Sequence, residues 1–524
     1  MLQIFSRGLP DCSSFLANFV RVPVIRASRQ YGHCGADRTP LFEHQASFSR
    51  PLLILGIETS CDDTSVALVE TQHRPSGIKD ASKTGAIAHH RTLRVIFHER
   101  LTAKDEGHQG IHPIVALESH RTNLALLVQK AFQRWNDDRV KEASSDEPMQ
   151  HATTPIMPPL EFIAVTRGPG MRSNLSVGID TAKGLAVGMN VPLLGVHHMQ
   201  AHALTPRLVS ALENSRHGEQ PKRILPRFPF LSVLVSGGHT MLIDSQALTA
   251  HSILAESQDI AIGEFLDKVA RVTLPPQLLV LPYGRSLERF AFETVIEPAT
   301  WRPTDVEGCN ESTNYTLSNS EPRYEYTACD THHEIMRSRK TKWGWAISPP
   351  LQERKGGESK RMEYSFAGLL TSVERLVKEI SAARQMPLAE RQELAREVQR
   401  VAFEHLASRI LLYLKSTKGS EWQGDTVVVS GGVAANQYLR HVLRSLLDAQ
   451  GFHHIKLAFP PVDLATDNAL MIAWAGIEMW DAGHQSDLTI GPIRKWSMDP
   501  SAPDGGILGV SGWKMANPAR QDVP

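Results

Sequence analysis

Apolar runs separated by short polar turns recur along the chain and predict β-strands. The run PLLILGIETSCDDTSVALVE begins at Pro51 with an apolar stretch, passes through a polar turn and continues as a second stretch with alternating character. The same order returns in FPFLSVLVSGGHTMLID over 228–244. Short apolar runs bounded by turn residues are typical of buried strands. Two strand–turn–strand units therefore begin two halves of the chain, which indicates a duplicated architecture.

Segments with helical spacing of apolar residues lie between and after these units. Helices are predicted over 120–135, 174–189, 365–380 and 389–414, and a third apolar strand followed by a helix over 426–443. Alternating strands and helices predict an α/β fold class. Two stretches interrupt the pattern with polar and turn-forming residues, a surface loop over 136–157 and a disordered insertion over 292–343.

Length and composition set broad limits on the number of domains and on the class of protein. A chain of 524 residues exceeds one compact core and predicts two or three domains. Lys plus Arg and Asp plus Glu balance at 56 each, so any contact with nucleic acid has to come from local basic patches. The five cysteines include no C-x-x-C pair, which argues against a disulfide framework and a cysteine-bound zinc. No apolar run approaches the roughly 18 residues needed to span a bilayer.

The first fifty residues differ from the rest in charge. Their arginines outnumber the three acids Asp11, Asp37 and Glu43, and no compact apolar core with a small-residue cleavage site is present. This composition predicts a mitochondrial transit peptide over 1–48. A disordered extension without a targeting role is the alternative.

The segment VHHMQAHAL over 196–204 places two histidines four residues apart. If His198 opens a helix, His202 lies one turn later on the same face, and the two imidazoles can hold a divalent ion with a third ligand from elsewhere. The alternative is a pair of structural histidines. A zinc protease needs a carboxylate base beside the metal-bound water, which Met199 and Gln200 cannot supply.

Three glycine turns follow predicted strands, in GPGM over 168–171, VSGGHT over 235–240 and VSGGVAAN over 429–436. Glycine lets backbone N–H groups approach an anion, and the third turn runs into a helix N-terminus, which favours phosphate or nucleotide. Simple chain reversal is the alternative. None of these turns carries a P-loop or dinucleotide-binding pattern. Asp467, in the sequence TDNA before an apolar run, is expected by default to cap a helix.

Taken together and in order, eight motifs resemble one family. They are GIETSCDDTSVAL, GPGM with SVGIDTAKGLA and VHHMQAH, LVSGGHT, GEFLDKVAR, YSFAGLLT, VVSGGVAAN and ATDNALMIA. The chain closely resembles the tRNA N6-adenosine threonylcarbamoyltransferase family, formerly described as O-sialoglycoprotein endopeptidases, over 51–290 and 345–513. Within it the resemblance is closest to the mitochondrial members.

The resemblance implies a two-lobed, actin-like fold of the sugar-kinase and heat-shock ATPase type, with a duplicated RNase H-like domain. The implied plan has an N-terminal lobe over 51–225, a C-terminal lobe over 226–460 that contains the insertion, and a segment over 461–496 that packs back on the first lobe. A tail over 497–524 follows.

The resemblance also implies an activity, a metal and a set of site residues. The family transfers a threonylcarbamoyl group from L-threonylcarbamoyl-adenylate to the adenosine 3′ of the anticodon in tRNAs that read ANN codons, releasing AMP. It implies one divalent ion, iron or zinc, on His198, His202 and Asp467, and catalytic acids at Asp62 and Asp63. The matching adenylate-binding positions are Leu234, Val235, Ser236, Gly237, Gly238, Asp267, Gly284 and Asn436.

Several positions depart from the family pattern. Asp63 is shorter than the usual Glu, Gln200 and Ala201 replace Glu and Gly, and Leu370 replaces Lys. A Pro-Gly-Gly-Pro motif is replaced by PPQLLVLPYGRSLE, which weakens the match of Gly284. The candidate phosphate contacts are Arg172, Lys183, Lys268 and Arg271, with a solvated charged face as the favoured alternative for each of them.

Mitochondrial members are implied to be homodimers that receive the adenylate from a separate synthase. Rival interpretations are an ATPase or small-molecule kinase of the same fold, a metal-dependent glycoprotease, and a non-enzymatic subunit, because cytosolic relatives work inside the KEOPS assembly.

Overall fold

The structure is a computed structural model in which the described residues belong to the unit Phe48–Pro524. The described ranges are 51–74, 90–103, 112–143, 156–216, 222–293, 295–296, 316–317, 324–352, 358–417 and 422–515. The transit peptide predicted over 1–48 lies outside them. Within these ranges, no helix combines the length and apolar character needed to cross a bilayer.

The first lobe is built on a seven-stranded sheet with the order β16-β15-β5-β4-β1-β2-β3. Its strands are β1 (Leu52–Glu58), β2 (Asp63–Arg74), β3 (His90–Thr102), β4 (Phe162–Gly168), β5 (Leu193–His197), β15 (His484–Ser486) and β16 (Trp513–Met515). β1 pairs antiparallel with β2, with Ile57 opposite Val66, and parallel with β4. The central strands are apolar along their length because helices cover both faces of the sheet.

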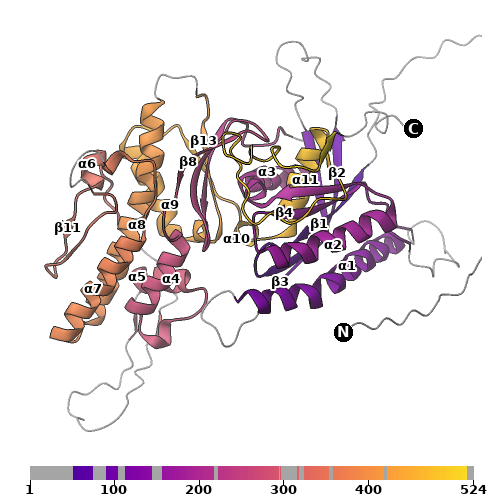
Figure 1. The fold of residues 1–524 in the computed structure, drawn as a ribbon. Helices are drawn as coiled ribbons and strands as arrows, with labels where there is room; N and C mark the ends of the chain where they lie inside the picture. The colour runs from indigo at the N-terminus through magenta and orange to yellow at the C-terminus, as the bar shows by residue number, and fades with distance from the viewer. Residues whose placement is uncertain are drawn as a thin grey trace, which may run out of the picture. The chain divides into compact units, whose positions relative to one another are not determined.

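Four helices flank this sheet (Figure 1). α1 (Pro113–Ala143) and α2 (Arg172–Met189) lie on one face, and α3 (His198–Arg216) and α11 (Ala469–Asp481) on the other. The surface loop predicted over 136–157 is wrong at its start, because α1 continues through this polar stretch to Ala143. In this last part of the helix Asn136 and Asp138 are half-buried and Val140 is exposed, so the helix continues here without burying an apolar side chain.

The second lobe repeats the first lobe's strand order. Its five-stranded sheet has the order β14-β13-β6-β7-β8, which matches β5-β4-β1-β2-β3 in both sequence order and direction of pairing. The strands are β6 (Phe230–Val235), β7 (Thr240–Ser245), β8 (His251–Glu256), β13 (Thr426–Ser430) and β14 (Lys456–Ala458). The predicted duplicated, actin-like α/β fold is thereby confirmed.

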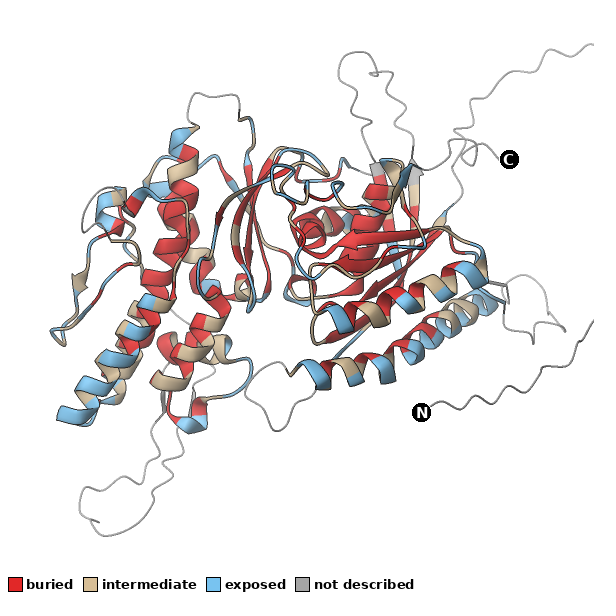
Figure 2. Ribbon diagram, in the orientation of Figure 1, coloured by how far each residue is buried: buried red, intermediate tan, exposed pale blue. Residues whose placement is uncertain are grey.

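Helices of the second lobe pack around one apolar core, which Figure 2 shows as the buried faces of the long helices. The elements are α4 (Ile262–Thr273), η1 (Pro276–Leu278), α5 (Tyr283–Phe292), α6 (His332–Ile335), η2 (Glu358–Lys360), α7 (Ala367–Ala383), α8 (Leu388–Ser416), η3 (Gly432–Ala435) and α9 (Gln437–Ala449). The short helix α10 (Val462–Ala465) instead places Leu464 in the core that contains α3 and α11. Two small antiparallel pairs, β9 (Val295–Ile296) with β10 (Thr316–Leu317) and β11 (Arg339–Lys340) with β12 (Ala346–Ile347), complete the second lobe.

The disordered insertion predicted over 292–343 is too wide. Residues 324–343 are described and contain α6 and β11, and the side chains of Cys329, Ile335 and Met336 are buried in the core of the second lobe. The stretch is polar on average, but Tyr324, Tyr326 and Ala328 also pack against that core. Residues 297–315 and 318–323 lie outside the described residues.

The chain returns to the first lobe after β14. α10 leads into α11, which packs against α3 and the strands β1 and β2. Trp474 of α11 is 1% exposed and joins the core between α3 and the first sheet. β15 and β16 then extend the first sheet beyond β5. The turn between α10 and α11 is thereby placed over the start of α3.

Candidate metal centre and glycine turns

The two histidines of the VHHMQAH motif open α3, as the sequence predicts. β5 ends at His197, whose buried imidazole contacts the carbonyl of Trp496, and the helix begins at His198. The rings of His198 and His202 lie edge to face with centroids 4.7 Å apart. Both residues are buried, and residues four apart on a helix share a face. Their Nε2 atoms point toward the turn before α11.

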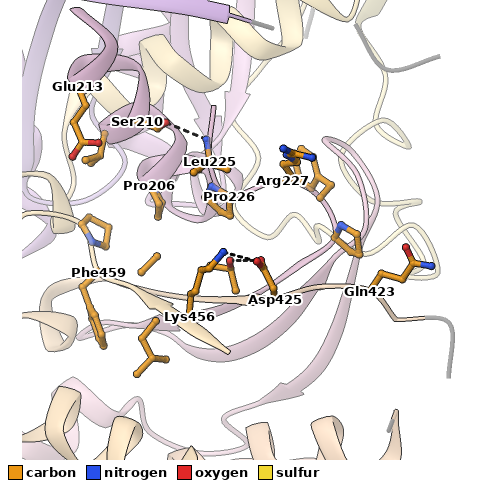
Figure 3. Close-up of a pocket in the computed structure, with 17 residues that line it drawn as sticks. Pro206, Ser210, Glu213, Leu225, Pro226, Arg227, Gln423, Asp425, Lys456 and Phe459 are labelled. Atoms are coloured by element: carbon orange, nitrogen blue, oxygen red, sulfur yellow. Dashed lines mark hydrogen bonds and ion pairs between the residues drawn. The ribbon is translucent and has the colours of Figure 1, made fainter. Parts of the chain in front are cut away.

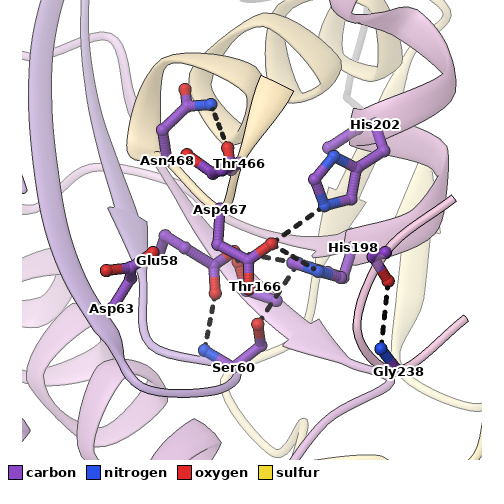
Figure 4. A network of polar contacts seen from close by, with 12 residues as sticks. Glu58, Ser60, Asp63, Thr166, His198, His202, Gly238, Thr466, Asp467 and Asn468 are labelled. Carbon is purple, nitrogen blue, oxygen red and sulfur yellow. Dashed lines mark hydrogen bonds and ion pairs between the residues drawn. The ribbon is translucent and has the colours of Figure 1, made fainter. Parts of the chain in front are cut away.

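Asp467 supplies the third side chain from that turn. Its Oδ1 lies 3.0 Å from Nε2 of His202 and 3.4 Å from Nε2 of His198, as Figure 4 shows. The helix cap expected of Asp467 is provided by its neighbour instead, because the side-chain oxygen of Asn468 accepts the Met471 N–H at 3.0 Å. The carboxylate of Asp467 is therefore free to face the histidines.

These three side chains have the composition and spacing of a metal site. Their ligand atoms all lie within 4.8 Å of one another. An ion bound at about 2.1 Å by nitrogen and oxygen ligands holds them about 3.0–3.5 Å apart, which matches the contacts of Asp467. Two imidazoles and one carboxylate suit zinc, iron and similar divalent metals. The residues thus fit a divalent ion with open coordination positions.

A buried carboxylate contacts this cluster through the second ring nitrogen of His198. Glu58, at the end of β1, is fully buried, and its Oε2 lies 3.1 Å from Nδ1 of His198. It accepts hydrogen bonds of 2.5 Å from the Thr166 hydroxyl and from the Ser60 N–H. Ser60 Oγ also lies 3.3 Å from Nδ1 of His198. The first and fourth strands therefore fix one edge of the His198 ring.

The charges in the metal-free cluster are strongly coupled. Burial opposes the charged form of every group, but the carboxylates of Asp467 and Glu58 raise the pKa of His198 to about 10. In return, despite burial, the charge of His198 and hydrogen bonds from both imidazoles hold the pKa of Asp467 well below its usual range. The pKa of Glu58 is also lowered, because the attraction of His198 outweighs burial. Two carboxylates thus share one charged imidazole, and the negative charge left over is what a bound cation would balance.

The two predicted catalytic acids differ in position. Asp63 is buried at the start of β2 and accepts a hydrogen bond from Thr102 at 2.5 Å, with Arg100 3.8 Å away. Burial raises the pKa of Asp63 to about 6. The Arg100 guanidinium also bonds Thr466, the residue before Asp467. Asp62 is half-buried, and its carbonyl accepts the Ala103 N–H. Asp63 thus ties the first turn to β3, while Asp62 remains the acid nearer the surface.

The turn between β1 and β2 is held in place by a buried histidine and by the GPGM turn. His120 of α1 has Nδ1 2.8 Å from the Thr64 hydroxyl and Nε2 2.9 Å from the carbonyl of Cys61. The carbonyl can only accept, so Nε2 of His120 donates. The Met171 N–H bonds the Ser60 carbonyl, and a Cβ at Gly170 would lie 2.8 Å from that oxygen. The GPGM turn therefore packs closely against the turn between β1 and β2. This close approach requires a residue without a Cβ at Gly170.

The other two glycine turns lie against each other. Gly431 has φ of +98°, and a Cβ there would collide with the carbonyl oxygen of Val235. The Ser236 carbonyl accepts the N–H of Gly263 at 3.1 Å, which places the VSGGHT turn at the start of α4. Gly237 and Gly238 are exposed, with open space where a Cβ would lie. Leu234 and Val235 themselves are buried in the two cores.

Three predicted adenylate-binding residues remain. Two of them form a hydrogen bond with each other, and the third caps a helix. Asp267 of α4 accepts the Gly284 N–H at 3.1 Å at the start of α5. Burial raises the pKa of Asp267. Asn436 caps α9 by accepting the Leu439 N–H, and it donates to Gln399 at 3.1 Å. The two residues Asp267 and Gly284 are thus brought together despite the altered sequence between them.

Two departures from the family pattern have structural explanations. Gln200 is fully buried and donates to the carbonyl of Leu248 at 2.8 Å, so its side chain joins α3 to the second lobe. Leu370 is buried in the core of the second lobe, where a lysine would need an ionic partner. Of the candidate phosphate contacts, Lys268 pairs with Glu264 at 2.7 Å, and Arg271 stacks over Tyr283.

A separate surface pocket of about 870 Å³ lies elsewhere on the protein (Figure 3). Its walls are the second half of α3, the segment 225–229 and the beginnings of β13 and β14. Asp425 and Lys456 form an ion pair of 2.7 Å within it. The glycine turn follows the end of β13, whereas this pocket lies at its start. None of the predicted site residues lines it.

Sequence reasoning missed the residues that support the site. Glu58 lies within the motif GIETSCDDTSVAL, but no local pattern assigns a role to it, to Thr166 or to Arg100. The available signal for Glu58 is an acid at the end of an otherwise apolar strand, because a buried carboxylate requires partners. Its partner, His198, stands 140 residues away.

The fold and the site define an actin-like α/β protein with a candidate metal centre beside glycine turns. The family model for tRNA N6-adenosine threonylcarbamoyltransferase, TsaD, matches residues 149–310 and 328–474. The chain belongs to this family, and it is accordingly a transferase that modifies tRNA. The metal dependence general to the family agrees with the His–His–Asp cluster.

Several relatives match over most of the chain. The mitochondrial tRNA N6-adenosine threonylcarbamoyltransferase of Schizosaccharomyces pombe is 34% identical over 88% of this chain and 89% of its own. The mitochondrial protein of Danio rerio is 30% identical, covering 87% and 89% respectively. The protein of Cereibacter sphaeroides is 31% identical over 87% of this chain and 96% of its own. In agreement with the predicted localisation, the chain is a mitochondrial member of the family.

Proposed function

We propose that the protein transfers the threonylcarbamoyl group of L-threonylcarbamoyl-adenylate to N6 of the adenosine 3′ of the anticodon, in mitochondrial tRNAs that read ANN codons. The observation that carries the proposal is the convergence of Asp467 on His198 at 3.4 Å and on His202 at 3.0 Å, in a chain of this family. A protease is disfavoured because α3 presents Met199 and Gln200 where a carboxylate base would stand.

The reaction forms one bond and breaks one. The exocyclic amine of adenosine attacks the carbamoyl carbon, the bond from that carbon to the phosphate oxygen breaks, and AMP leaves. The amine is a weak nucleophile, so positioning of the two substrates supplies much of the acceleration. The half-buried carboxylate of Asp62 is our candidate to accept the amine proton or to orient the amine.

The glycine turns and their neighbours would grip the adenylate. Open space beside Gly237 and Gly238 allows the backbone N–H groups of this turn to approach the phosphate. The backbone of Leu234 and Val235 and the side chain of Ser236 flank the same turn. Asp267, held by Gly284, is placed to bond a ribose hydroxyl or the base, and Asn436 has one N–H and one lone pair beyond its bonds in the fold.

His198, His202 and Asp467 would hold one divalent ion, iron or zinc. When bound, this ion supplies a Lewis acid for the carbonyl or phosphate oxygen. The protein's own contribution is to fix the three ligands on two elements that pack against each other on one face of the first sheet, the start of α3 and the turn before α11. Open coordination positions remain for the substrate.

The partners follow from the chemistry of the substrates. An adenosine in the single-stranded anticodon loop can be splayed into a site without opening a helix. The activated adenylate requires a separate synthase. We further propose a homodimer through the outer faces of α1 and α2, where large apolar side chains are exposed, namely Ile114, Leu126, Val140 and Val187. Mass photometry of the wild-type and Leu126→Asp proteins tests the dimer, which is expected to dissociate in the variant.

Reconstitution tests the proposed activity. The purified protein, synthetic L-threonylcarbamoyl-adenylate and an unmodified tRNA transcript should yield threonylcarbamoyladenosine and AMP in equal amounts, measured by mass spectrometry of nucleoside digests. A transcript with guanosine in place of the target adenosine should yield neither. ATP hydrolysis or phosphorylation of a small hydroxyl compound without transfer would favour the kinase alternative. Normal threonylcarbamoyladenosine in mitochondrial tRNA of cells that lack this protein would reject the proposal.

A further inference from the structure

Glu58 presents its carboxylate to donors on every side. Oε1 accepts the Ser60 N–H, and Oε2 accepts the Thr166 hydroxyl and lies 3.1 Å from Nδ1 of His198. The residue is fully buried, so it cannot reach a substrate in the way a catalytic residue must. A buried carboxylate surrounded by donors is what the ionised form requires.

This arrangement determines which nitrogen of His198 carries the proton. Because Oε2 of Glu58 can only accept, Nδ1 of His198 donates, which leaves the lone pair of the neutral ring on Nε2. Nε2 is the atom that lies 3.4 Å from Asp467. His202 has no such support, since its Nδ1 is buried without a hydrogen-bond partner in the part of the chain that the structure describes.

We propose that Glu58 is a positioning residue that fixes the tautomer and ring orientation of His198 for metal binding. The inference rests on the metal centre of the proposed function. Histidine ligands commonly donate their second N–H to a carboxylate, and loss of that partner typically lowers metal affinity 10- to 100-fold. Here the carboxylate comes from β1, so this strand is joined to the metal centre through the side chain of Glu58, while Ser60 Oγ of the following turn lies 3.3 Å from the same nitrogen.

The variant Glu58→Gln separates this role from simple packing. The amide has nearly the same volume, but its NH₂ must replace one carboxylate oxygen. At the Oε1 position it would face the Ser60 N–H, donor against donor. At the Oε2 position the Thr166 hydroxyl can turn to the Ile57 carbonyl, 3.5 Å away, but His198 must then accept on Nδ1. The second arrangement places the proton on Nε2, where the metal should bind.

Thr166→Val is the matched control because it leaves the carboxylate and its contacts with Ser60 and His198 in place. Zinc alone is the probe, titrated into metal-free protein against a chromogenic chelator at fixed pH. Glu58→Gln is expected to lower zinc affinity by about 10- to 100-fold. Thr166→Val is expected to lower it by less than about tenfold, the worth of one hydrogen bond. Equal affinity in Glu58→Gln and wild type would overturn the inference.

A measurement without any variant guards against misfolding of Glu58→Gln. In zinc-loaded wild-type protein labelled with ¹⁵N-histidine, NMR is expected to show His198 with its proton on Nδ1 and zinc on Nε2. The reverse assignment would overturn the role of Glu58 while leaving the metal centre intact. Wild-type protein that takes up no zinc or iron would instead overturn the metal centre of the proposed function, and the positioning role with it.

Discussion

His202 and Asp467 lie 3.0 Å apart, Nε2 to Oδ1, although 265 positions separate them in the chain. The contact depends on the return of the chain to the first lobe through α10 and α11. It also depends on Asn468, which takes the cap of α11 and leaves the neighbouring carboxylate free. Two adjacent residues thus have separate roles, one in the centre and one in the helix.

These separate roles predict different effects for substitutions of Asp467 and Asn468. Asp467→Asn removes a charged ligand and should reduce transfer by at least about a hundredfold, because a metal's charge stabilisation is worth several kcal/mol. Asn468→Ala removes the cap and the hydrogen bonds from its amide to the carbonyls of Leu464 and Thr466, so it should cost about 2–4 kcal/mol of stability while metal content stays near one per chain. Metal analysis, transfer assays and thermal unfolding distinguish them. Full metal content in Asp467→Asn would contradict the assignment.

Metal uptake should release a proton at neutral pH. The pKa of His198 is raised from 6.5 to about 10 in the metal-free cluster, so its imidazole is protonated at pH 7.5, whereas a metal binds the neutral ring. Zinc affinity should therefore rise by about tenfold per pH unit between pH 7 and 9.

The stability that protonated His198 gives the metal-free chain is full below about pH 6.5 and is lost as the pH rises through about 10.

Isothermal titration calorimetry in buffers of different ionisation enthalpy measures that proton. A slope of one released proton per zinc is expected at pH 7.5, with a smaller value in Asp467→Asn, because Asp467 is the first of the carboxylates that raise the pKa of His198. Zinc binding with no released proton would show that the histidines are already neutral, contrary to the charge balance of the cluster.

Asp63→Asn should show whether the second acid serves structure or chemistry. Burial raises the pKa of Asp63 from 3.8 to about 6, so the folded protein binds its proton more tightly than the unfolded chain. Ionisation of Asp63 therefore costs stability as the pH rises from about 4 through 6. The stability of Asp63→Asn relative to wild type should increase over that interval, by on the order of 1–3 kcal/mol, and stay level above it.

Chemical denaturation at pH 4, 5, 6 and 7.5 gives that difference, and the transfer rate of the same variant is measured alongside. A catalytic base would lose its function in the amide, whereas a residue that mainly holds Thr102 and Arg100 should retain most of the rate. A difference in stability that is independent of pH would rule out the raised pKa.

The two stacked glycine turns should respond differently to a methyl group. Gly431→Ala forces a side chain onto a φ of +98° and into the carbonyl of Val235, so the protein should lose at least about 1–3 kcal/mol. Gly237→Ala has open space and should change stability by less than about 0.5 kcal/mol.

If the adenylate phosphate approaches the VSGGHT turn, Gly237→Ala should raise KM for the adenylate by about tenfold or more, because a crowded contact costs about 1–3 kcal/mol. The readouts are thermal unfolding and steady-state kinetics. An unchanged KM in Gly237→Ala would place the adenylate elsewhere.

Local patterns predicted the strands, the start of α3 and the pairing of two histidines, because each depends on spacing within a few residues. The third ligand did not follow from spacing. The sequence TDNA suggested a cap, and only the resemblance to a family assigned Asp467 to the metal. Glu58 could not be found locally either, since its partner His198 lies on another element. Distant polar pairs leave no periodic pattern, so they emerge only when the strand order is known.

Average polarity misled the predictions in two places. Residues 136–143 are mostly polar, yet they continue α1 to Ala143, and those of their side chains that the structure describes are exposed or half-buried. Residues 324–343 are polar overall, yet Cys329 and Ile335 anchor them on the second lobe. A small number of apolar side chains can hold a segment when a prepared surface already exists, which the segment's own composition does not reveal.

The placement of β15 and β16 on the edge of the first sheet has a consequence for biogenesis. The ribosome releases the first five strands of that sheet, β1 to β5, long before α11 and these two strands exist. The early product therefore exposes the sheet face that α11 later covers, and it has two imidazoles without their acidic counterpart. The three ligands of the proposed metal site are therefore all present only near the end of synthesis, so an incomplete chain cannot bind the ion through all three.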